Sequence, residues 1–205
     1  MNKNREIIFL IFMGLIPLLW IRQGYIIANG DDFPFWFNPE GTLERDIYLW
    51  SIHNMGDANV ACSYMVYESI WLFFKLCRAS VDIIQIFIHV FLFMGAGLSM
   101  YRLSKHIYPD MKLANITSGI FYMFNFFVLQ TRHNIGFMWS YALLPLLIIQ
   151  LIKITNVNAE HSTKNATAKN IVYFSLLSTI VLSFAGINPA NLVIILGAVS
   201  YTHLR

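Results

Sequence analysis

The segment VDIIQIFIHVFLFMGAGLSMY, residues Val81–Tyr101, decides the fold class, because Asp82 is its only charged side chain. An α-helix needs about 20 predominantly apolar residues to cross the hydrocarbon core of a bilayer. A run of this length and composition therefore predicts a transmembrane helix.

The whole chain has the composition of a membrane protein. Of its 205 residues, 57% are hydrophobic and 12% are charged, whereas soluble domains carry about 25% charged residues. The sequence predicts an all-α, polytopic transmembrane helical bundle. Its apolar runs predict spans at residues 7–28, 81–101, 113–130, 138–152 and 171–187, with a truncated sixth from about residue 191. Residues 1–205 are then the N-terminal part of one membrane domain.

The distribution of charge predicts the orientation in the membrane. Eight basic residues lie in three short segments, 1–6, 102–112 and 153–170, which the positive-inside rule places in the cytoplasm. Most of the carboxylates and all five tryptophans lie in or beside the opposite segments. We expect a multi-pass protein of the plasma membrane with a cytoplasmic N-terminus and residues 29–80 outside. The net charge of +3 comes without a basic stripe elsewhere, so a nucleic-acid partner is not expected.

The first outer loop, residues 29–80, is too long for a plain connection and is expected to carry function. Leu43, Ile47 and Trp50 recur at helical spacing, and Thr42 is a candidate N-cap, which predicts an amphipathic helix along the membrane surface. Residues 60–77 predict a second helix. The charge pattern favours an interfacial or re-entrant helix there over a true span.

Asp31 and Asp32 follow directly after the first predicted span, in NGDDFPFWFNPE (Asn29–Glu40). Carboxylates at headgroup depth can act as bases or hold a divalent cation that binds phosphate. In the simpler alternative, the pair caps a turn and hydrates a helix end. The sequence establishes no cofactor; if a metal such as a divalent cation binds, Asp31 and Asp32 are the candidate ligands.

The order of several motifs resembles a known enzyme family. The motifs are GDDFPFWFNPE (30–40), YLWSIHNMGDAN (48–59), YESIW (67–71), GAGLSMYRLSK (95–105) and ITSGIFYMFNFFVLQTRHNIGFMWSYALLPLLI (116–148). Over about residues 5–155 the chain is similar to the N-terminal membrane region of GT-C-fold glycosyltransferases, in particular those similar to alpha-(1->3)-arabinofuranosyltransferases.

The resemblance implies an enzyme that transfers a sugar from a polyprenyl-phosphate donor to a cell-envelope glycan or a lipid-linked acceptor on the outer face. It implies a catalytic acid soon after the first span, which Asp31 and Asp32 match. The leaving phosphate needs cations, for which Arg45, Arg132, His53 and His133 are candidates. Since an acid at membrane depth is a functional candidate by default, Glu68 joins the substrate-binding set.

Each candidate has a structural alternative, and the function has two. Arg132 can anchor a helix end among headgroups, and His53 can be a solvated polar residue. The chain can instead be a transporter or flippase of lipid-linked glycans, or a non-catalytic partner in an envelope-biosynthesis complex. GT-C enzymes usually have eight or more spans, so residues 1–205 alone are expected to be inactive.

Overall fold

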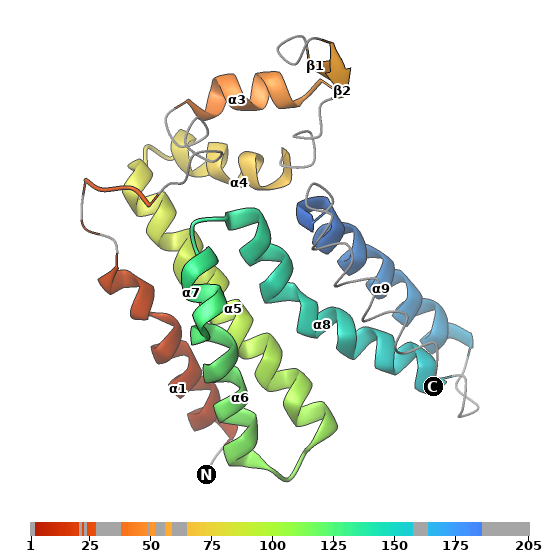
Figure 1. The fold of residues 1–205 in the computed structure, drawn as a ribbon. Coiled ribbons are helices and arrows are strands. Elements are labelled where there is room, and N and C mark those ends of the chain that lie inside the picture. The colour runs from red at the N-terminus through yellow and green to blue at the C-terminus, as the bar shows by residue number, and fades with distance from the viewer. Residues whose placement is uncertain are drawn as a thin grey trace.

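The computed structural model describes residues 3–20, 22, 24–27, 38–48, 50–51, 56–58, 65–157 and 164–185. This part of the chain is mostly helical (Figure 1). Two antiparallel strands of two residues each, β1 (Trp50–Ser51) and β2 (Asp57–Ala58), place Trp50 opposite Ala58. The predicted helical class is confirmed at this level.

Within the described residues, three stretches are long and apolar enough to cross a membrane. They are α5 (Val81–Ile107), the consecutive helices α6 (Lys112–Phe124) and α7 (Phe126–Thr131), and most of α8 (Ile135–Val157). The predicted spans 81–101, 113–130 and 138–152 fall within these stretches. Their length and composition indicate association with a lipid bilayer.

The second of these stretches is broken at Asn125, which separates α6 from α7. Asn125 has an extended backbone, with ψ of 157°. Its side-chain oxygen accepts a hydrogen bond from the Val128 N–H at 3.0 Å, as an N-cap does. The chain therefore starts a new helix here.

The first predicted span, residues 7–28, is not one helix. Helix α1 (Lys3–Gly14) is followed by the 3-10 helix η1 (Ile16–Leu19), whose first turn contains Pro17. Proline has no N–H and cannot continue the α-helical hydrogen bonds. Gly24, at φ +81°, is in the left-handed region that favours glycine. The predicted helix is therefore wrong over Gly24–Ile27, although α1 and η1 pack along α5 as a first span would.

Helix α9 (Lys164–Ala185) packs along α8, with Phe174 and Leu177 against the buried Leu147. Its described apolar stretch, Asn170–Ile180, is shorter than a spanning helix. The predicted fifth span at 171–187 is therefore helical over its described residues. The described apolar stretch is shorter than predicted. The predicted sixth run, from about residue 191, lies outside the described residues.

The buried core surrounds α5, which contacts α1, α6 and α8. Phe93 and Ala96 of α5 are fully buried with Leu10 of α1 and Met123 of α6. A Cβ on Gly119 would lie 2.9 Å from the carbonyl oxygen of Gly97, so only glycine allows α6 to approach α5 this closely.

Two short helices, α3 (Pro39–Asp46) and α4 (Met65–Leu76), lie across one end of the bundle (Figure 1). Twelve residues of helix are about 18 Å long, too short to cross a membrane, and this favours the interfacial interpretation of α4.

The amphipathic helix expected from Leu43 onward differs from the observed α3. The helix begins at Pro39 with Asn38 as its N-cap, because asparagine and proline are strong residues for these two positions. It ends at Asp46, and Trp50 belongs to β1. Ile47 and Trp50 lie beyond the end of α3 and are 52% and 62% exposed, so Leu43, Ile47 and Trp50 do not form one helical stripe.

Candidate functional site

Helices α3 and α4 form an antiparallel pair. The Lys75 Nζ in the last turn of α4 lies 3.1 Å from the Glu40 Oε1 in the first turn of α3. At the other end of the pair, Asp46 of α3 is hydrogen-bonded to Glu68 of α4. An exposed ion pair thus closes one end and a buried carboxyl pair closes the other.

The start of α3 directs Asp46 toward α4. The Asn38 Oδ1 accepts a hydrogen bond from the Gly41 N–H at 3.2 Å, and the Thr42 hydroxyl donates to the Asn38 carbonyl at 2.8 Å. Asp46 follows Thr42 by four residues and shares its face of the helix. Both side chains are buried, and Asp46 is only 1% exposed.

Among the described acids of this loop, Glu68 has the pKa that departs furthest from its ordinary value. Its side chain is 2% exposed. Burial raises the pKa of Glu68 from 4.5 to about 8, helped by the hydrogen bond to Asp46 and by the negative charge of Asp46, and opposed by Arg45. At neutral pH Glu68 therefore holds its proton and donates it in the hydrogen bond to the Asp46 carboxylate.

Arg45 places a cation beside the Glu68–Asp46 pair. The Arg45 Nε donates to the Asp46 Oδ1 at 2.9 Å, and the guanidinium group remains largely exposed. The Glu68 Oε2 is buried and has no hydrogen-bond partner among the described residues. The arrangement is thus a carboxylic acid beside a carboxylate, with one oxygen atom left to bind a further donor.

A second polar group lies along the first turns of α5. The Gln85 Oε1 accepts a hydrogen bond from the Ile27 N–H at 2.7 Å, and the Gln85 Nε2 donates to the Ile27 carbonyl at 2.5 Å. The Asp82 Oδ2 accepts a hydrogen bond from the Gly24 N–H at 3.2 Å. These contacts fasten the chain that leads toward Asp31 to the side of α5.

His89 joins α5 to the turn after α7. Its Nε2 lies 3.1 Å from the Arg132 carbonyl oxygen and its Nδ1 lies 2.8 Å from the Gln85 carbonyl oxygen. A neutral imidazole donates to one of these two acceptors. His89 thus has one contact within α5 and one that reaches the turn after α7.

Arg132 points toward the end of the first helical segment. Its Nη1 donates to the Leu129 carbonyl, and its guanidinium lies 5.7 Å from the centre of the Trp20 ring. Its Nε is buried and has no partner in the part of the chain that the structure describes. His133 follows in the same turn and is half-buried. Both alternatives for Arg132 remain consistent with this position, since it anchors the helix end and keeps one free donor.

The predicted site residues therefore fall into three sets. Arg45 and Glu68 are brought together by α3 and α4, while Arg132 and His133 belong to the second polar group. Asp31, Asp32 and His53 lie outside the described residues.

Two residues of these groups were missed from the sequence, namely Asp46 and Gln85. Asp46 lies off the apolar stripe that was predicted from Leu43, Ile47 and Trp50, so it was not a candidate. No spacing within α3 marks it, because the contact with α4 decides which face of the helix is buried. Gln85 gives no signal either, because its partner is a backbone segment 58 residues away.

The described residues contain no group of three or more histidine, cysteine, aspartate or glutamate side chains that could hold a metal ion. The two acids expected to bind a divalent cation lie outside this part of the chain. The expectation about a metal therefore stays a prediction.

Comparison with known proteins gave no match to any family model, to any curated protein or to any solved structure. The candidate site rests on the contacts within this chain.

Proposed function

We propose that the chain belongs to a membrane glycosyltransferase that transfers a sugar from a polyprenyl-phosphate donor to a cell-envelope glycan or lipid-linked acceptor. The observation that carries the proposal is the buried Glu68–Asp46 pair, held by two short helices across one end of an apolar bundle. Acids with raised pKa values are concentrated at functional sites. The ordered motifs that resemble GT-C-fold enzymes give the pair its chemical context.

The position of the pair suits a lipid-linked substrate. A polyprenyl phosphate keeps its chain in the bilayer and its sugar phosphate at the depth of the headgroups. A site for it must therefore lie where spanning helices end, and α3 and α4 lie at such an end (Figure 1). With the proposed orientation, this end faces the outside of the plasma membrane.

The proposed reaction is a substitution at the anomeric carbon of the sugar. A bond forms between that carbon and the acceptor oxygen while the bond to the phosphate oxygen breaks. The acceptor proton passes to a carboxylate, for which Asp31 and Asp32 are proposed, and the polyprenyl phosphate leaves as an anion. Arg45, Arg132, His53 and His133 are the proposed cations for this phosphate.

Glu68 would hold a substrate hydroxyl rather than take its proton. Its protonated oxygen is directed to Asp46, and its other oxygen is the buried atom without a described partner. A sugar or acceptor hydroxyl that donates to this oxygen would complete its hydrogen bonds. Opening of the α3–α4 contact would be needed to admit the sugar, because the pair is buried.

The transporter alternative requires polar groups inside the bundle that are free to bind a passing substrate. Two pairs of buried polar side chains near one end of the described bundle are bonded to one another instead. Tyr101 donates to Glu6 at 2.5 Å, and Ser104 donates to Asn115 at 2.6 Å. We therefore place the glycosyltransferase first.

The proposal is tested by sugar transfer in membranes that contain the full-length protein. Glu68→Gln and Asp46→Asn should each lower transfer, because each changes the carboxyl pair while keeping its shape. Glu44→Gln, an exposed acid on the same helix α3, is the matched control and should transfer as the wild type does. Equal transfer by all four proteins would remove the carboxyl pair from the function.

A further inference from the structure

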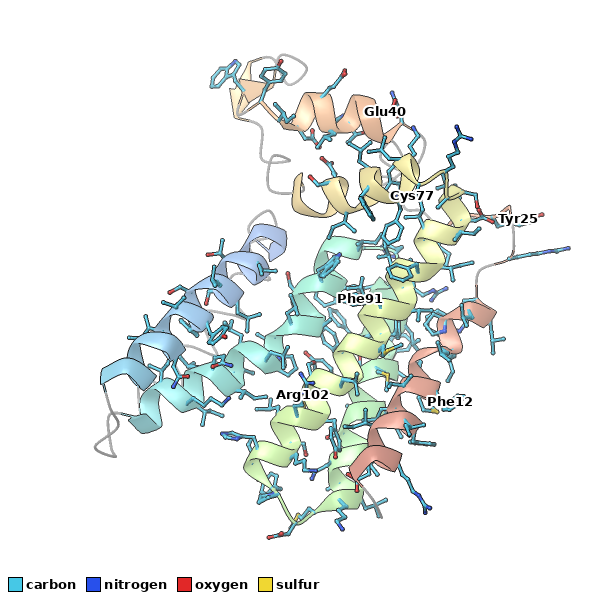
Figure 2. All side chains as sticks on the ribbon, turned by 180° about the vertical axis from the view of Figure 1, so that it is seen from behind. Phe12, Tyr25, Glu40, Cys77, Phe91 and Arg102 are labelled. Atoms are coloured by element: carbon cyan, nitrogen blue, oxygen red, sulfur yellow. The ribbon has the colours of Figure 1, made fainter. Side chains whose placement is uncertain are left out.

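A cavity of about 200 Å³ lies between α5 and α8, on a different part of the bundle from the carboxyl pair. Its lining is apolar over most of its length, with Phe91, Leu92 and Leu98 from α5 and Trp139 and Leu146 from α8. The two helices lie side by side where α8 begins and diverge toward the other end (Figures 1 and 2). We call this cavity the α5–α8 groove.

The groove ends at a cation. Arg102 is the one charged residue of its lining and lies one turn beyond Leu98. Its side chain is exposed, and its guanidinium makes no ion pair or hydrogen bond within the part of the chain that the structure describes. Arg102 is therefore free to bind an anion at the mouth of the groove.

The length of the groove matches one leaflet of a bilayer. Phe91 and Arg102 are eleven residues apart on one helix, which is about 16 Å at 1.5 Å per residue. This is about half of the 30 Å hydrocarbon core. Arg102 thus lies near headgroup depth when Phe91 lies near the bilayer centre, and Figure 2 labels both residues along α5.

The groove is open to the lipid side and has room within it. Phe91 at its inner end is 52% exposed. A Cβ on Gly95 would meet only the Ala142 Cβ, at 3.9 Å, which is an ordinary van der Waals contact. The walls therefore leave space for a flexible chain at the level of Gly95.

We propose that the α5–α8 groove binds an anionic phospholipid from the leaflet at the Arg102 end, with an acyl chain along the apolar lining and the phosphate on Arg102. Arginine recognises phosphate through its fork of N–H donors. Helices α1 and α6 begin at this end of the bundle (Figure 1), and the exposed Arg5 and Lys112 in their first turns add to the attraction for an anionic headgroup. The site lies toward the opposite end of α5 from α3 and α4 and does not depend on the proposed glycosyl transfer.

The site can be tested with the full-length protein in vesicles of phosphatidylcholine and phosphatidylglycerol. Each lipid is supplied in turn with a photoactivatable diazirine on one acyl chain, and labelled peptides from α5 and α8 are counted by mass spectrometry. Wild-type protein should label more strongly with the phosphatidylglycerol probe. Arg102→Gln should lower that labelling about fivefold, the effect of one cation near an anionic surface, and leave the phosphatidylcholine labelling unchanged.

Two further variants separate a groove from general attraction. Lys112→Gln removes one exposed charge at the same end that does not line the groove, so it should lower the labelling of α5 and α8 by the phosphatidylglycerol probe less than Arg102→Gln does. Gly95→Leu fills the groove and should lower labelling by both probes. Arg102→Gln changes an exposed side chain and should not affect folding. It therefore still tests the proposal if Gly95→Leu does not fold.

Three outcomes would overturn the proposal. Equal labelling of the wild type by both lipids would show an ordinary lipid-facing surface. Equal loss in Arg102→Gln and Lys112→Gln would show attraction by charge alone. An absence of label in the groove, with the flanking surface labelled, would show that a protein segment fills it.

Discussion

The side-chain amide of Gln85 forms two hydrogen bonds with the backbone of Ile27, one to its N–H at 2.7 Å and one to its carbonyl at 2.5 Å. Gln85 belongs to α5, a helix long and apolar enough to cross a membrane, whereas Ile27 precedes Asp31 by four residues in the sequence. The contact replaces the helical hydrogen bonds that Ile27 would make in a continuous first span. It therefore fixes the backbone of Ile27 against the first turns of α5.

Gln85→Leu should destabilise the protein, because it leaves the N–H and the carbonyl of Ile27 without these partners. An unsatisfied buried polar group costs about 1–3 kcal/mol. Thermal unfolding in detergent measures the change, and Gln130→Leu, an exposed glutamine of α7, is the control. A Tm equal to that of the control would show that the Gln85 contact contributes little.

Glu68 should make stability depend on pH. The pKa of Glu68 is about 8 in the folded chain against an ordinary value of 4.5, so the unfolded chain binds fewer protons between these values. The free energy of unfolding should therefore fall as the pH rises from about 5 to about 8, by up to about 4 kcal/mol, and level off above.

Two variants test the origin of this pH dependence. Glu68→Gln cannot ionise and should flatten the profile. Asp46→Asn removes the charge that helps to raise the pKa of Glu68, so its profile should level off at a lower pH. Unfolding curves measured across this range decide the matter, and a wild-type profile that rises toward pH 8 would contradict the account.

The same added methyl group should affect the stability of the protein differently at two glycines, Gly119 and Gly95. Gly119→Ala should destabilise the bundle by about 1–3 kcal/mol, because its Cβ would lie 2.9 Å from the rigid carbonyl oxygen of Gly97. The Cβ added in Gly95→Ala would make an ordinary van der Waals contact with the Ala142 Cβ at 3.9 Å, so this change should be tolerated. Thermal unfolding of both variants makes the comparison, and similar loss in the two would argue against close packing of α6 on α5.

Tyr101→Phe should weaken the contact between α1 and α5. Tyr101 donates a hydrogen bond to the buried Glu6 carboxyl group at 2.5 Å, and the Lys105 Nζ lies 3.1 Å from the same hydroxyl. Loss of the donor should lower the free energy of unfolding by about 1–3 kcal/mol. Tyr108→Phe, at a tyrosine that is 55% exposed, is the control. An equal Tm for the two variants would mean that Glu6 finds another donor.

The three long apolar stretches could be predicted from the sequence because hydrophobicity over 18 or more residues leaves few alternatives to a spanning helix. Interruptions of a helix within an apolar run were harder to predict. Pro17 and Gly24 interrupt the first run, yet their effect depends on Gln85, which satisfies the freed backbone of Ile27. The start of α3 was predictable from Asn38 and Pro39, but Thr42 competed with them as a cap.

In the candidate site, one residue of the carboxyl pair could be predicted from the sequence and the other could not. Glu68 stood out as an acid in an apolar helix, and its burial agrees with that reasoning. Asp46 did not stand out, because one helix of eight residues can turn either face toward its neighbour. The contact with α4, a tertiary interaction, decides which face is buried, and no pattern within α3 contains that information.

The measurement that tests the central proposal most directly is transfer of radiolabelled sugar from a panel of polyprenyl-phosphate donors. Membranes should contain either the full-length protein or its Asp31→Asn/Asp32→Asn form, with insertion of both verified. The account predicts transfer from at least one donor by the first and none by the second. Transfer by both proteins would remove the two acids from the mechanism. The absence of transfer from every donor would contradict the proposed glycosyltransferase.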